Sequence, residues 1–180
     1  MWSEDLTAVW LSTTGNAYYA AKNGFTSTCT YTATPPTAAC SITTIASNQD
    51  LNGISGSSDN NVVAAGKNGE VYIYDGANWS INPSTIPGNP GDDLEDVSVI
   101  NDTSSVVAGK NGTVLLQDNS TWSTLTTPNG EDLKAVWAYS TTEIYVFGKK
   151  GTIYHYDATT TTWSDLSGAA ATGNNDDFED

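Results

Sequence analysis

The chain has 180 residues, with 21 acidic side chains against 6 basic ones, and a formal net charge of −15 at pH 7. All six basic residues are lysines, and phosphate backbones need a basic surface, so we expect no binding to nucleic acid. No apolar stretch approaches the roughly 18 residues of a membrane span, so we expect no membrane insertion by this chain.

A pattern recurs four times along the chain. An Asp-Leu pair begins at Asp5, Asp50, Asp93 and Asp132, and a lysine follows each aspartate by 17 residues, at Lys22, Lys67, Lys110 and Lys149. A β-branched residue stands four positions after each aspartate. Four matches at one offset indicate a structural repeat of about 40 residues.

The first repeat, at about residues 5–47, contains both cysteines of the chain. Cys29 and Cys40 bracket TYTATPPTAA, where the later repeats carry a tryptophan. We expect a disulfide between them that pins the last two strands of this repeat and indicates an oxidising compartment. Two buried free thiols are the alternative.

The second repeat (about 50–83) is followed by the proline- and glycine-rich connection INPSTIPGNPGD, which is unsuited to a central strand. The third repeat (about 93–126) is regular. The fourth (132–166) reads as four strands, LKAVWAY, EIYVFG, TIYHYD and TTWSDL, because its alternation has period two. Residues 167–180 have no periodicity and predict an acidic C-terminal tail.

Each lysine lies in a tetrapeptide of the type GKNG, and Asn-Gly is a strong hairpin signal. Four short strands per repeat predict an all-β fold, a β-propeller with four four-stranded antiparallel blades over residues 1–166. Both a closed four-blade disc and an open arc are compatible with the sequence.

The segments GKNGEVYIYDGANWS, GKNGTVLLQDNSTWS and GKKGTIYHYDATTTTWS resemble tandem propeller repeats of bacterial extracellular proteins, which are similar to the Asp-box repeats of bacterial neuraminidases. The resemblance covers about residues 5–166. It implies a structural role for Asp75, Asp118 and Asp157, with the tryptophans that follow them, and implies no activity.

The recurring lysines are expected on one face of the propeller, next to the recurring aspartates. They are candidates for an anion-binding ring, and the alternative is that each aspartate pairs with a lysine or accepts hydrogen bonds from hairpin amides. Trp10 and Trp137 occupy equivalent positions and are candidates for stacking on sugar rings, with filling of the core as the alternative.

The composition argues against catalysis. A sialidase needs clustered guanidinium groups, which this chain lacks, and recurring aspartates at equivalent positions indicate structure rather than a catalytic pair. We expect His155 to be a packing residue. One histidine and two cysteines are too few for a usual zinc site, so we expect no metal and no cofactor.

These observations predict a non-catalytic, exported and extracellular module, from a bacterium, that recognises a protein or a glycan at the cell surface. The alternative is a structural subunit of a surface assembly such as a pilus or another filament. Self-assembly, or completion of the propeller by another chain, would belong to that alternative.

Overall fold

The computed structural model describes residues 5–33, 36–45, 48–81 and 86–170, and these form an all-β protein. Sixteen strands pair into four four-stranded antiparallel sheets, one for each sequence repeat. In every sheet the strands lie side by side in chain order. The predicted all-β fold, with four antiparallel strands per repeat, is therefore confirmed.

The four sheets are numbered here in chain order. Sheet 1 contains β1 (Leu6–Leu11), β2 (Asn16–Ala21), β3 (Phe25–Ala33) and β4 (Pro36–Thr44). Sheet 2 contains β5 (Leu51–Ser58), β6 (Asn61–Gly66), β7 (Val71–Tyr74) and β8 (Trp79–Ile81). Sheet 3 contains β9 (Leu94–Asn101), β10 (Ser104–Gly109), β11 (Thr113–Asp118) and β12 (Thr121–Thr126). Sheet 4 contains β13 (Leu133–Ser140), β14 (Glu143–Gly148), β15 (Ile153–Asp157) and β16 (Thr162–Asp165).

A short 3₁₀ turn joins the second and third strands of every sheet, at Lys22–Gly24, Lys67–Gly69, Lys110–Gly112 and Lys149–Gly151. The middle residue of each turn has a left-handed backbone, with φ between 53° and 60°. Asparagine tolerates this conformation better than most residues and takes it in three turns, whereas Lys150 takes it in the fourth. The Asn-Gly pairs therefore mark these turns, as the sequence predicts.

The hydrophobic core lies between neighbouring sheets. Three clusters of buried side chains fill the spaces between sheets 1 and 2, 2 and 3, and 3 and 4. Every residue of β6 and β10 is buried, because a sheet covers each of their faces. In β14 buried and half-buried residues alternate, as expected where one face of the sheet is covered.

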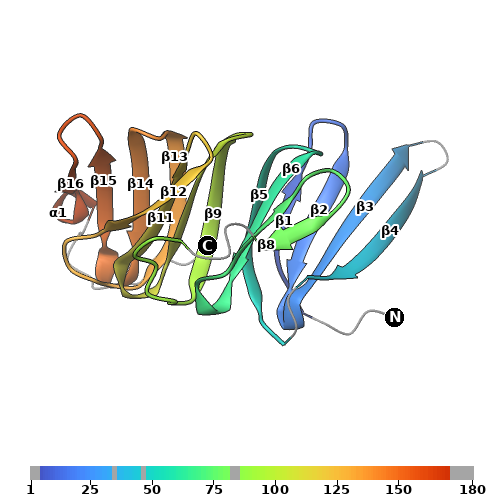
Figure 1. Ribbon diagram of the computed structural model, residues 1–180, viewed down its shortest axis with the longest axis horizontal. Coiled ribbons are helices and arrows are strands. Elements are labelled where there is room, and N and C mark those ends of the chain that lie inside the picture. Colours follow the sequence, from blue (N-terminus) through green and yellow to red (C-terminus); the bar gives the residue numbers. More distant parts are fainter. Residues whose placement is uncertain (1–4, 34–35, 46–47, 82–85, 171–180) are drawn as a thin grey trace.

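The sheets do not close into a ring. Figure 1 shows sheet 1 and sheet 4 at opposite ends of the molecule, so the closed four-blade disc is not the observed arrangement. The first strands β1, β5, β9 and β13 contact one another in succession, while β3 and β4 lean away from sheet 2 (Figure 1). Each sheet is therefore covered by its sequence neighbours, and the first and last sheets each have one such neighbour.

The predicted disulfide between Cys29 and Cys40 is present. The two cysteines face each other directly in the register of β3 and β4, so the bond joins neighbouring strands of one hairpin. At the other end, Ser167–Ala170 forms the short helix α1, where the sequence predicts an irregular tail. The remainder of the predicted acidic tail, residues 171–180, lies outside the described residues.

Candidate functional site

The four recurring lysines are all paired. Each ammonium group lies 2.6–2.8 Å from a carboxylate oxygen of the aspartate 17 residues earlier, in the pairs Lys22–Asp5, Lys67–Asp50, Lys110–Asp93 and Lys149–Asp132. The backbone N–H of each lysine also donates to the backbone carbonyl of its aspartate. These contacts fit the structural alternative, in which the lysines serve the repeat.

The second carboxylate oxygen of three of these aspartates connects neighbouring sheets. The backbone N–H of Asn23 donates to Oδ1 of Asp50, and the equivalent bonds from Asn68 to Asp93 and from Asn111 to Asp132 measure 3.3 and 3.1 Å. The lysine ammonium and the turn amide together hold the pKa values of these three carboxyls below their usual range; for Asp93, partial burial opposes the shift. Each recurring aspartate in sheets 2–4 is therefore an ionised link to the preceding sheet.

Trp10 and Trp137 are equivalent in the repeat but differ in environment. Trp10 packs against the core between sheets 1 and 2, with its ring centroid 5.5 Å from that of Tyr18. Its ring lies so close to the backbone of sheet 2 that a Cβ at Gly56 would be 2.8 Å from it. Trp137 lies on the outer face of sheet 4 and is 54% exposed. Trp10 is thus a core residue, and only Trp137 is available to a partner.

His155 stacks on Tyr145 with a centroid distance of 4.5 Å, and its Nε2 lies 2.7 Å from the carboxylate of Glu143. In the turns between third and fourth strands, Asp75 accepts hydrogen bonds from the backbone N–H groups of Ala77 and Asn78. Asp157 likewise accepts from the backbone N–H of Thr159. These carboxylates stabilise tight turns, which is the role that the resemblance implies.

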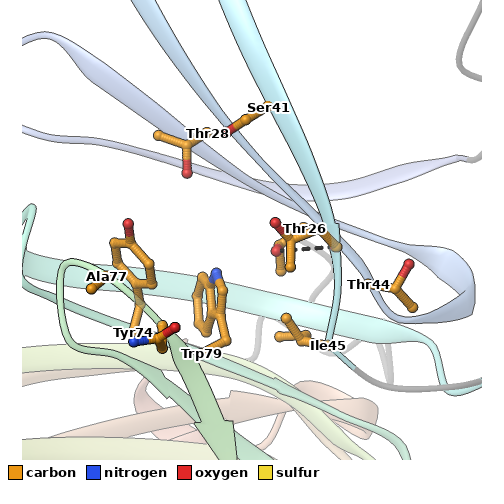
Figure 2. A pocket seen from close by; sticks show the side chains of 10 residues that line it. Thr26, Thr28, Ser41, Thr44, Ile45, Tyr74, Ala77 and Trp79 are labelled. Atoms are coloured by element: carbon orange, nitrogen blue, oxygen red, sulfur yellow. Dashed lines mark hydrogen bonds between the residues drawn. The ribbon is translucent and has the colours of Figure 1, made fainter.

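The candidate binding site is a cleft between the outer strands of sheets 1 and 2. It has a volume of about 410 Å³, within the usual range for small-molecule sites. Figure 2 shows the rings of Tyr74 and Trp79 side by side on one wall, facing Thr28 and Ser41 on the other. The lining residues share one property, the absence of charge: Thr26, Thr28, Ser41, Thr43, Thr44, Ile45, Tyr74, Ala77, Asn78 and Trp79.

The leaning of β3 and β4 away from sheet 2 creates this cleft (Figure 1). The Cys29–Cys40 bond keeps the two strands of that hairpin together. On the floor, Tyr74 and Trp79 have ring centroids 5.3 Å apart, and the hydroxyl of Tyr74 donates to the carbonyl of Gly76. The result is a cleft with two fixed aromatic rings facing a row of hydroxyl groups.

Sequence reasoning did not select this cleft. It selected Trp79 as an interblade packing residue, and Trp79 does pack against the core between sheets 1 and 2. The signals that single out the cleft are the absence of tryptophan in the first repeat and the threonines around Cys29 and Cys40. Those signals become a site only once the two sheets are seen to diverge.

Two further searches of the described part of the chain found nothing. Among its residues, no group of three or more histidine, cysteine, aspartate or glutamate side chains could hold a metal ion. None of its helices is long and apolar enough to span a membrane. No protein-family model matches the chain, and no curated protein sequence is detectably similar to it.

Proposed function

We propose that this protein is a non-catalytic extracellular recognition module, an open propeller-like arc that binds an uncharged glycan in the cleft between sheets 1 and 2. The observation that carries the proposal is the composition of the cleft, in which Tyr74 and Trp79 face a wall of hydroxyl groups without a charged side chain among them. A sugar offers apolar ring faces and many hydroxyls, which match these two kinds of surface.

The arrangement of the sheets supports the propeller-like part of the proposal. Each sheet is a four-stranded meander, and the first strands of neighbouring sheets contact one another. The outer strands of sheets 1 and 2 diverge (Figure 1), as blades do when they radiate from an axis. The clefts between outer strands are then natural binding positions on a rigid scaffold.

The disulfide supports export. Disulfides such as Cys29–Cys40 persist in oxidising environments and are rare in the reducing interior of cells. An excess of acidic over basic side chains, 21 against 6, makes a neutral ligand a better match than an anionic one. A glycan fits the cleft better than a protein partner, because the cleft is narrow and hydroxylated rather than a broad apolar surface.

The test is a glycan array followed by titration calorimetry with the best ligand. We expect Trp79→Ala to weaken binding by about tenfold or more, because a stacked ring contributes about 0.5–1.5 kcal/mol beyond the apolar area it buries. Thr28→Val, which removes a hydroxyl at nearly constant volume, should also weaken binding. Trp79→Phe, which keeps a ring, should retain most of it.

The matched control is Trp163→Ala. Trp163 is the corresponding tryptophan of sheet 4, where it packs on Tyr156 with a centroid distance of 5.1 Å, far from the cleft. This variant should lose stability but bind the ligand as the wild type does. An array without a hit, or unchanged binding by Trp79→Ala, would overturn the proposal.

A further inference from the structure

The first strand of sheet 1 exposes side chains that the other sheets bury. Leu6, Val9 and Leu11 are 52%, 59% and 66% exposed. At the first two of these positions, the equivalents in sheets 2–4 lie against the preceding sheet and are at most 6% exposed: Leu51, Ile54, Leu94, Val97, Leu133 and Val136. Sheet 1 therefore presents the half of a sheet–sheet interface that normally receives a preceding sheet.

Sheet 4 presents the opposite half. Trp137 and Tyr139 on β13 are 54% and 74% exposed, and the ring of Tyr145 lies 6.0 Å from that of Trp137. Trp10, the equivalent of Trp137, packs on the following sheet at Gly56. The outer face of sheet 4 therefore has the position and the apolar character of a face that receives a following sheet.

We propose that the two end faces bind each other between copies of this chain, so that β13 of one copy lies against β1 of the next. The partner is a second copy because the chain carries both halves of the contact that joins its own sheets, at opposite ends of the molecule (Figure 1). Leu11 stands at the position of Gly56, so Trp137 would lie on a leucine side chain instead of on backbone.

Asp5 extends the match beyond apolar contact. Its carboxylate pairs with Lys22 as the other recurring aspartates pair with their lysines, yet its side chain is 73% exposed, against 23–26% for Asp50, Asp93 and Asp132. In the stacked arrangement the Lys149–Gly151 turn of the preceding copy approaches Asp5, as the turns of sheets 1–3 approach the next aspartate. Head-to-tail contacts of this kind form a ring or an open filament, so the contact fits the assembly subunit expected as the alternative from the sequence.

The experiment measures molar mass in solution at low and high protein concentration. We expect the wild type to form multiples of the single-chain mass as concentration rises. Added salt should promote the association, because two copies that each carry a charge of −15 repel one another. Wild-type protein that remains a single chain at both concentrations overturns the proposal.

Two variants with one disabled face each show which surfaces meet. Leu11→Lys disables the face of sheet 1, and Tyr139→Lys disables the face of sheet 4; both side chains are exposed, so both variants should fold. Each variant alone should be a single chain, whereas an equimolar mixture should form a dimer, since the intact faces of the two variants are complementary. Association of Leu11→Lys alone would indicate contact between two copies of the sheet 4 face and would overturn the proposal.

The inference is independent of the glycan cleft. Trp79→Ala should assemble as the wild type does, so loss of ligand binding and loss of assembly are separable results. If the wild type is a single chain and hydrogen exchange shows β13 protected, the face belongs to the chain's own residues 171–180, and the proposal is overturned in favour of that segment.

Discussion

The recurring aspartates do two structural tasks at once. In sheets 2–4 one carboxylate oxygen holds the lysine of the same sheet, and the other accepts a turn amide from the preceding sheet, as in Asp93 with Lys110 and Asn68. Burial is partial, and several bonds stabilise the charged form. A single residue type therefore fixes both the turn within a sheet and the contact between sheets.

Removal of one such carboxylate tests this dual role. We expect Asp93→Ala to lower the free energy of unfolding by about 1–3 kcal/mol, since it leaves the Asn68 amide and the Lys110 ammonium without their shared acceptor. Chemical denaturation monitored by tryptophan fluorescence measures the change.

Asp5→Ala is the matched control. Asp5 pairs with Lys22 at the surface, and the loss of such an exposed pair costs about 0–1 kcal/mol. Equal destabilisation by the two variants would show that the bond between sheets contributes nothing measurable.

The repeat could be read from the sequence at this scale, but the bond between sheets could not. The offset of 17 residues identifies each aspartate with its lysine, because both lie within one repeat. The link from Asn23 to Asp50 joins two repeats through a backbone amide, which no side-chain pattern encodes. The pins at the opposite ends of the sheets, such as Tyr18 to Asp59 at 3.0 Å, were missed for the same reason.

At the scale of elements, the hairpin of β3 and β4 is the least regular part of the scaffold and the wall of the cleft. Its strands are held by Cys29–Cys40 where the other sheets use a tryptophan after the third strand. The sequence predicted this substitution of one device for the other. The outward lean of the hairpin depends on its packing against sheet 2, and a repeat pattern does not report that.

We expect the double variant Cys29→Ser and Cys40→Ser to lose roughly 3 kcal/mol of unfolding free energy, because the bond closes a short loop. Glycan binding should weaken in parallel, since β3 and β4 supply one wall of the cleft. Wild-type protein treated with a reductant is the control and should match the variant. An unchanged unfolding midpoint in both samples would mean that strand pairing alone holds the hairpin.

For the whole molecule, the sequence predicts the unit and its number but not how the units are placed. Strand order, turn positions and the inward residues all follow from a period of two inside a period of about forty. Whether four sheets close or remain open depends on the rotation between neighbours, which arises from side-chain packing along β1, β5, β9 and β13. Residues such as Leu11 and Tyr139 therefore look like core positions in the sequence and are exposed in the structure.

The dependence of stability on pH is a property of the whole series of sheets. The pKa values of Asp50, Asp93 and Asp132 are lowered in the folded protein, by their lysine partners and then by the turn amides, with burial opposing. A lowered folded-state pKa stabilises the protein at pH values above the unfolded-state value, about 4, and this contribution is lost as the pH falls through the folded-state pKa. Protonation also relieves the repulsion within a chain of net charge −15, which opposes the loss.

We expect the links between sheets to dominate, because three of them break together. The unfolding free energy should stay nearly constant from pH 7 to pH 5 and fall below about pH 4. Denaturation at a series of pH values measures this profile, and Asp93→Asn should make the acid fall shallower because one linked carboxylate no longer titrates. Stability that rises steadily on acidification to pH 3 would show that relief of repulsion outweighs the aspartate links.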